Sequence, residues 1–185
     1  NVTVTAAPVA GTLSGTQNIC VGDNTTFSST SPGGSWSSSD PTIATVDPLT
    51  GDISGIAAGT ATMTYTVTGS GGCADVTANR TVTVTAAPVA GTLAGNQNIC
   101  VGGTTTFTST VAGGTWSTSN AGIASVISGT GVITGVSAGT ATITYSVLGS
   151  GGCPDAIVSQ TVTVTTAPVA GTLSGTQNIC VGDNT

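Results

Sequence analysis

The sequence predicts an all-β protein built from small antiparallel β-sandwiches repeated in tandem. A closely similar segment of Thr, Val, Ala, Pro and Gly begins at residues 1, 81 and 161, which gives a period of 80 residues. Thr, Val and Ile, which favour strands, are frequent, while strong helix formers other than Ala are scarce. A period of this length with Gly-rich turns makes each repeat a small domain of its own.

The repeat period divides the chain into two whole domains and two partial ones. We expect residues 1–5 to be the last strand of a preceding repeat, 6–85 and 86–165 to be complete sandwiches, and 166–185 to begin a further repeat. Each boundary ends in a Pro, which cannot continue a strand ladder. Such short linkers predict a linear, semi-rigid rod or filament; the linker residues are Ala86, Ala87, Pro88, Thr166, Ala167 and Pro168.

Strands are expected throughout each repeat. In the first repeat they are predicted at residues 9–13, 25–29, 34–38, 43–46, 53–56, 60–67 and 81–85, separated by Gly- and Pro-containing turns. The clearest is 60–67, in which Ala61, Met63, Tyr65 and Val67 alternate with threonines. This period of two predicts one buried and one solvated face.

One aromatic residue of each kind recurs at the same place in both complete repeats. We expect these residues to fill the sandwich cores, as single aromatics at fixed positions commonly do. The alternative for Trp36 is a platform on which a sugar stacks. The predicted core aromatics are Phe27, Trp36, Tyr65, Phe107, Trp116 and Tyr145.

The chain has five cysteines, whose disulfides would stabilise domains too small to rely on their hydrophobic cores alone. The economical prediction is pairing within each repeat, Cys20–Cys73 and Cys100–Cys153, with the partner of Cys180 outside this sequence. Pairing across repeats, such as Cys73 with Cys100, stays open because sequence does not fix connectivity. A within-repeat disulfide would add roughly 4 kcal/mol and implies an oxidising, extracellular location. Without His or a C-x-x-C motif, a metal site is not expected.

Charged side chains are almost absent. Arg80 is the single cation, seven Asp are the only acids, and the net charge is −6. A single arginine cannot neutralise the phosphates of a nucleic acid, so nucleic acid is not expected as a partner. Apolar runs are too short for a membrane-spanning helix. With no His, Glu or Lys, we expect no enzymatic activity and no cofactor.

The aspartates do not recur as a calcium site would. Positions 40, 47 and 52 are Asp in the first repeat and Asn, Ile and Val at 120, 127 and 132 in the second. Calcium bound through them is therefore not a general property of the array, although a calcium ion at the linkers stays open. Asp75 and Asp155, which follow a Gly-Gly-Cys turn, are expected to cap that turn.

The run from Gly34 to Tyr65 resembles the bacterial immunoglobulin-like domain, group 2, through its Trp-Ser-Ser-Ser-Asp-Pro-Thr-Ile-Ala-Thr-Val core and its Gly-Thr-Ala-Thr-Met-Thr-Tyr strand. The second repeat departs at residues 120–126 but keeps Trp116 and the strand at 139–145. The cysteine-bearing elements resemble repeats of giant surface adhesins and gliding-motility-associated proteins exported by type IX secretion. The resemblance implies Ig-like sandwiches in a stalk or filament at the bacterial surface, whose partners are copies of itself or further repeats.

Two other functions stay open at this point. The threonine rows could present hydroxyls to a glycan or to ice, although Thr is simply favoured on solvated strand faces. Short subunits could also polymerise by lending the strand at residues 2–5 to a neighbour.

Overall fold

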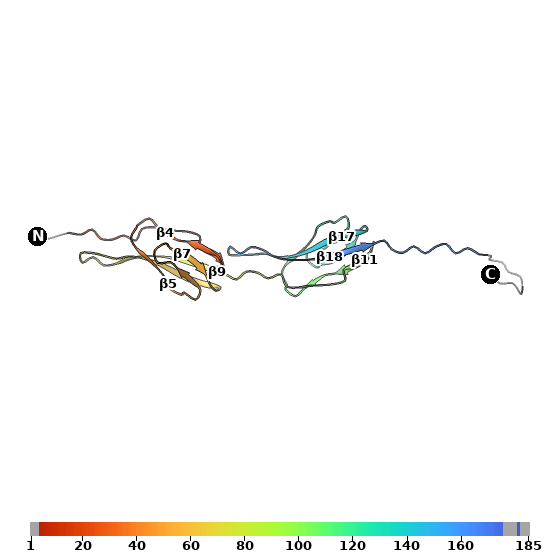
Figure 1. The fold of residues 1–185 in the computed structure, drawn as a ribbon, viewed down its shortest axis with the longest axis horizontal. Helices are drawn as coiled ribbons and strands as arrows, with labels where there is room; N and C mark the ends of the chain where they lie inside the picture. The colour runs from red at the N-terminus through yellow and green to blue at the C-terminus, as the bar shows by residue number, and fades with distance from the viewer. Residues whose placement is uncertain (1–3, 176–180, 182–185) are drawn as a thin grey trace. The chain divides into compact units, whose positions relative to one another are not determined.

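A computed structural model describes residues 4–175 and 181, and this part of the chain is all-β (Figure 1). Strands form several sheets, and the described residues contain no helix. None of the described residues therefore forms a helix long and apolar enough to cross a membrane. The predicted all-β class is confirmed.

The larger sheet of the first repeat has four strands. Its order is β2 (Asn18–Cys20), β9 (Val76–Thr85), β8 (Gly59–Val67) and β5 (Ser35–Ser38). The β5–β8 and β8–β9 pairs are antiparallel, but β2 runs parallel to β9. The prediction of a purely antiparallel sandwich is wrong at this edge, because β2 is a strand that the sequence analysis did not assign.

The smaller sheet has three strands in the order β3 (Asn24–Thr26), β7 (Asp52–Gly55) and β6 (Ala44–Val46). Both of its pairs are antiparallel. A short separate pair joins β1 (Leu13–Ser14) to β4 (Ser28–Ser29).

The second repeat has the same strand order as the first. Its sheets are β11-β18-β17-β14, β12-β16-β15 and β10-β13, and β11 is again parallel to β18. The strands are β10 (Leu93–Ala94), β11 (Asn98–Cys100), β12 (Thr104–Thr106), β13 (Thr108–Ser109), β14 (Thr115–Thr118), β15 (Ala124–Val126), β16 (Val132–Gly135), β17 (Gly139–Val147) and β18 (Ala156–Thr165).

Strand β9 is twice as long as the predicted strand at residues 81–85. Its inner face continues through Val76, Ala78 and Arg80 to Val82 and Val84, and the whole strand pairs with β8. Arg80 interrupts the apolar alternation at this face, which is why the pattern alone ended the strand too early.

The core of the first repeat lies between its sheets. Phe27, Ile53, Met63 and Val82 are fully buried there. The Trp36 ring packs against Tyr65 with ring centroids 4.8 Å apart. All six aromatics expected in the cores are buried in the structure, namely Phe27, Trp36, Tyr65, Phe107, Trp116 and Tyr145.

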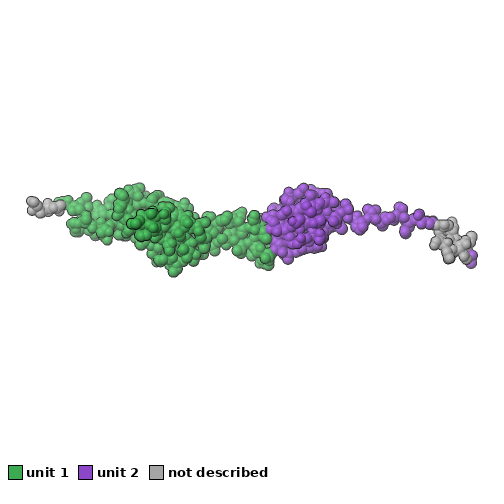
Figure 2. Space-filling model, in the orientation of Figure 1, with its two compact units in different colours: residues 1–92, 109–115, 145–158 green, residues 93–108, 116–144, 159–185 purple. Residues whose placement is uncertain are grey.

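The chain divides into two compact units (Figure 2). Residues 1–92, 109–115 and 145–158 form unit 1, and residues 93–108, 116–144 and 159–185 form unit 2. Two segments of the second sequence repeat therefore belong to unit 1 together with the first repeat. The domain limits drawn from the 80-residue period, 6–85 and 86–165, stay a prediction. The predicted linker residues lie outside strands, and all are exposed except the half-buried Pro88.

Candidate functional site: the cysteine positions

Unit 1 contains a disulfide between Cys20 and Cys153, with Cα atoms 4.8 Å apart. Cys20 ends β2 and lies opposite Thr85, the last residue of β9. The chain then turns away, with the Val21 amide donating to the Thr85 carbonyl at 2.9 Å. Cys20 is 3% exposed, so its sulfur is held at a buried strand end.

Cys153 comes from the connection between β17 and β18, residues 149–155, which we call the second cysteine loop. Gly151 and Gly152 have φ of 61° and 92°, a conformation that side chains with a Cβ rarely adopt. A Cβ on Gly151 would overlap the Thr85 side chain, and one on Gly152 would lie 2.9 Å from the Asn18 carbonyl. The glycines thus let this loop pack closely against the ends of β9 and β2.

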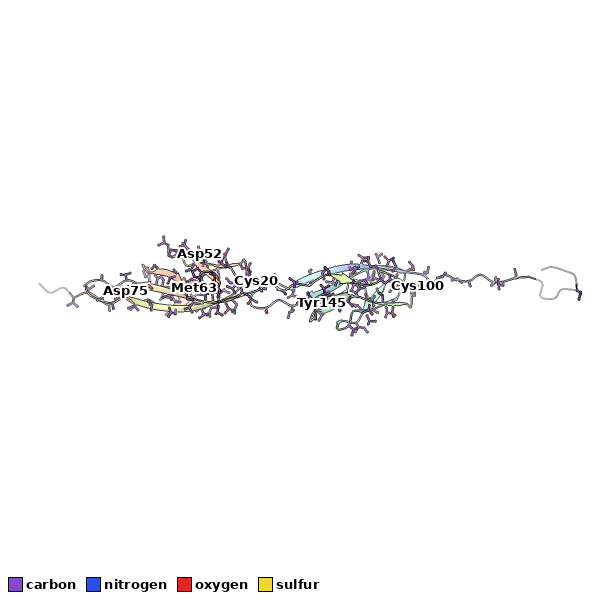
Figure 3. The ribbon with its side chains drawn as sticks, turned by 90° about the horizontal axis from the view of Figure 1, so that it is seen from below. Cys20, Asp52, Met63, Asp75, Cys100 and Tyr145 are labelled. Carbon is purple, nitrogen blue, oxygen red and sulfur yellow. A yellow bond between two sulfur atoms is a disulfide. The ribbon has the colours of Figure 1, made fainter. Side chains whose placement is uncertain are left out.

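The predicted pairing of Cys20 with Cys73 is wrong in this structure. Cys20 lies beside the last residue of β9, whereas Cys73 precedes its first residue, Val76. Ten residues of extended strand span roughly 30 Å, far beyond the ~7 Å that a disulfide allows between Cα atoms. Figure 3 shows Asp75, two residues after Cys73, near one end of unit 1 and well away from Cys20.

The predicted Cys100–Cys153 pair is wrong as well. Cys153 is bonded to Cys20, and Cys73 and Cys100 are both free thiols. The alternative pair Cys73–Cys100 is therefore not formed either. Pairing across the sequence repeats does occur, but between the other two cysteines. Cys180 lies outside the described residues.

Cys73 lies in an equivalent loop, residues 69–75, which we call the first cysteine loop. Gly71 and Gly72 again have positive φ, 62° and 89°. The Cys73 amide donates to the Ser70 carbonyl at 3.1 Å, as the Cys153 amide does to Ser150 at 3.0 Å. Thr5 takes the place of Thr85: a Cβ on Gly71 would overlap its side chain, and the Cys73 sulfur lies 3.8 Å from its carbonyl oxygen.

Cys100 repeats the setting of Cys20 at the end of β11. It lies opposite Thr165, and the Val101 amide donates to the Thr165 carbonyl at 2.8 Å. The Thr165 hydroxyl lies 3.9 Å from the Cys100 sulfur. Unlike Cys20, Cys100 is exposed.

Asp75 and Asp155 cap the two cysteine loops. The Gly69 amide donates to Asp75 Oδ1 at 2.8 Å, and the Gly149 amide donates to Asp155 Oδ1 at the same distance. Their predicted role as turn caps is confirmed. Within the described part of the chain, no three His, Cys, Asp or Glu side chains are grouped in a way that could hold a metal ion.

Three further aspartates of unit 1, Asp40, Asp47 and Asp52, accept hydrogen bonds from nearby residues. The Thr42 hydroxyl and amide hold the pKa of Asp40 below its usual value, and the Thr50 and Leu49 amides do the same for the pKa of Asp47. The Thr26 and Thr50 hydroxyls, donating at 2.6 and 2.8 Å, lower the pKa of Asp52. These carboxylates stabilise loops and strand ends of the first repeat.

A face of hydroxyls covers the outer side of the larger sheet in unit 1. The threonine rows of β8 and β9 lie side by side in register, and serines of β5 extend them. All of these side chains are half-buried or exposed. The sequence predicted each row but not their alignment across strands. This hydroxyl face consists of Ser35, Ser37, Thr62, Thr64, Thr66, Thr77, Thr81 and Thr83.

With the strands and cysteines placed, the chain can be compared with known proteins. Residues 1–78 match the bacterial Ig-like domain (group 2). The Ig-like resemblance seen in the sequence is confirmed for this region, whereas the relation to gliding-motility-associated adhesins stays a prediction. The comparison with curated proteins found no match.

Two solved structures are similar at low identity. A C-terminal 282-residue fragment of intimin, solved with the intimin-binding domain of its translocated receptor, is 15% identical with a TM-score of 0.47. The match covers 85% of this chain and 64% of that one. BT4661, a SusE-like surface-located polysaccharide-binding protein of Bacteroides thetaiotaomicron, is 15% identical with a TM-score of 0.34, over 80% of this chain and 32% of that one. The chain thus spans less than two thirds of either structure.

Proposed function

We propose that this chain is a non-enzymatic structural part of an extracellular stalk or filament on a bacterial surface. In this proposal, Ig-like repeats build length, and disulfides fasten each repeat to the next. The observation that carries it is the Cys20–Cys153 bond, which ties the start of the first sequence repeat to a loop of the second.

A bond of this kind constrains far more chain than a within-repeat disulfide. The two cysteines are 133 positions apart, and closing a loop of that length contributes about 5 kcal/mol on the chain-entropy model. That is comparable to the whole net stability of a small domain. Such a bond suits a protein that must persist outside the cell, and disulfides themselves persist in oxidising compartments.

The bond also changes how the chain carries tension. Force applied to residues outside the Cys20–Cys153 loop passes from Cys20 through the sulfurs to Cys153. The residues between them are not stretched, even when their domains unfold. A stalk built this way keeps its length under shear. Without the disulfide, the force would pass through each folded repeat and could unfold and extend it.

Single-molecule pulling tests this proposal on the whole chain, held at its two ends. The oxidised chain should extend about 450 Å less than the reduced chain, since each of the 133 residue steps spans ~3.4 Å when extended. A Cys153→Ser variant should behave like the reduced chain under both conditions. Equal extension of the oxidised wild type and this variant would refute the proposal that the Cys20–Cys153 bond carries the tension.

A second candidate function is favoured by the hydroxyl face, which aligns threonines across neighbouring strands. Regular hydroxyls on a sheet could bind a glycan or order water on an ice surface. A Thr62→Val, Thr64→Val, Thr81→Val variant removes three hydroxyls from its centre. If the wild type binds on a glycan array or shapes ice crystals and this variant does not, the surface-module function is supported; inert wild-type protein would reject it.

A further inference from the structure

We propose that the second repeat binds a guanidinium group at the place where the first repeat holds the guanidinium group of its own Arg80. The ligand is the free guanidinium ion or the side chain of an arginine from another molecule. The inference does not depend on the proposed function, because it rests on a comparison of equivalent positions in the two repeats.

In the first repeat, two backbone carbonyls and an aromatic ring form this place. Arg80 donates from Nη1 to the Leu13 carbonyl at 3.2 Å and from Nη2 to the Gly15 carbonyl at 2.7 Å. Its Cζ atom lies 5.3 Å from the centre of the Phe27 ring. Both the carbonyl oxygens and the face of the ring favour a cation. The place is therefore suited to a planar cation with several N–H donors.

The second repeat builds the same frame from the equivalent residues Leu93, Gly95 and Phe107. Strand β10 pairs with β13, as β1 pairs with β4. A Cβ on Gly95 would overlap the Phe107 ring, as one on Gly15 would overlap the Phe27 ring. Both glycines have positive φ, 147° and 129°. The backbone that carries the two carbonyls thus keeps its position beside the ring.

The side chains of the two repeats differ at the position of the arginine. Position 160, equivalent to Arg80, is Gln, whose side chain ends where that of arginine has its Nε atom. Among the described residues, Gln160 Oε1 and Arg80 Nε are both buried and have no hydrogen-bond partner. This agreement indicates that the two side chains follow the same course up to that atom. Gln160 then ends before it reaches the Leu93 and Gly95 carbonyls.

Three oxygen acceptors and an aromatic ring therefore face this place in unit 2. The oxygens are the Leu93 and Gly95 carbonyls and Gln160 Oε1, and the ring is that of Phe107. A guanidinium group offers N–H donors to all three oxygens and a positive charge to the ring. Residues 86–165 contain no Lys, Arg or His, so no cation of that repeat repels it. Gly95 is exposed, which gives a ligand access from solvent.

NMR titration of the full chain with guanidinium chloride, at constant ionic strength, tests the proposal. The Gly95 backbone amide and the Gln160 side-chain amide should shift and saturate in the millimolar range, because so small a ligand makes few contacts. Tetramethylammonium chloride, whose cation has no N–H donor, should leave both signals unchanged. N-acetylarginine amide distinguishes the two sources of the ligand. Saturable shifts with it as well mean that an arginine side chain reaches the site, whereas shifts with guanidinium alone mean that only the free ion does.

Two exchanges of residues between the repeats are matched variants. Gln160→Arg supplies the guanidinium group covalently and should abolish the shift of the Gly95 amide. Arg80→Gln should create a second site, so that the Gly15 amide also shifts. Absence of a saturable Gly95 shift in the wild type, or its persistence in Gln160→Arg, would overturn the proposal. A Gln160 amide group that itself donates to the two carbonyls would give the first of these results. The wild-type titration does not depend on the folding of either variant.

Discussion

The guanidinium group of Arg80 lies on the inner face of β9, where an apolar residue would be expected. It donates to the Leu13 carbonyl at 3.2 Å and to the Gly15 carbonyl at 2.7 Å, and it lies 5.3 Å from the centre of the Phe27 ring. The single cation of the chain thus ties β9 to the segment around β1. The second repeat has Gln160 at this position.

Replacing Arg80 by Gln should destabilise the first repeat. The shorter side chain loses the charged hydrogen bonds and the ring contact, at a cost of about 2 kcal/mol. Chemical unfolding of the full chain measures this loss. Asn79→Gln, a change at the exposed neighbouring position, should leave the unfolding midpoint unchanged, and an equal effect of the two changes would contradict the role given to Arg80.

Acidification should weaken the first repeat through Asp40, Asp47 and Asp52. Their hydrogen bonds hold the pKa values of these carboxyl groups below the usual value of 3.8, so the folded state binds their protons less readily than the unfolded state. Their contribution is complete above that value and is lost as the pH falls through the lowered pKa values.

Thermal unfolding at pH 6 and pH 2.5 measures this dependence. Asp→Asn substitution at the three positions should shrink the difference in melting temperature between the two pH values. The second repeat has no carboxylates at the equivalent positions 120, 127 and 132 and serves as an internal comparison. An unchanged pH dependence in the triple variant would show that these hydrogen bonds do not stabilise the fold.

At the scale of elements, the cysteine loops depend on glycine. Gly151→Ala would place a methyl group on the Thr85 side chain and strain a backbone with φ of 61°. We expect it to lower the equilibrium yield of the Cys20–Cys153 bond in a glutathione redox buffer. Gly129→Ala is the matched control, because its φ is not positive and its Cβ would meet nothing within 4 Å. Equal yields from both variants would contradict the close packing of this loop.

The sequence predicted the strands with a strong period of two and missed those without one. The run at 60–67 is β8 almost residue for residue, because Thr and apolar residues alternate without interruption. Strand β2 has three residues and one apolar position facing the core, Ile19, which is too little pattern to recognise. Its parallel pairing with β9 depends on contacts distant in the sequence.

The disulfide pairing could not be predicted from the sequence without knowing where β2 lies. The spacing of the cysteines alone favoured a bond between Cys20 and Cys73, since both lie in one repeat. Only the register of Cys20 beside Thr85 shows that these residues lie at opposite ends of a ten-residue strand. The β8–β9 hairpin was a usable signal, because it places Cys73 at the end of the sandwich away from Thr85.

At the scale of the whole molecule, the proposed function depends on which cysteines are joined. An 80-residue repeat with each disulfide inside one copy would be a string of separate locked domains. The Cys20–Cys153 bond instead joins consecutive sequence repeats covalently.

Peptide mapping of the oxidised full chain under non-reducing conditions tests this claim most directly. Arg80 is the only tryptic site, so trypsin is combined with an Asp-directed protease, which cuts between Cys20 and Cys73. Chymotrypsin is added to cut between Cys100 and Cys153, after Phe107, Trp116 or Tyr145. The structure predicts a peptide pair joined through Cys20 and Cys153, with alkylatable thiols at Cys73 and Cys100. Recovery of Cys20 joined to Cys73 and Cys100 joined to Cys153 would contradict the account.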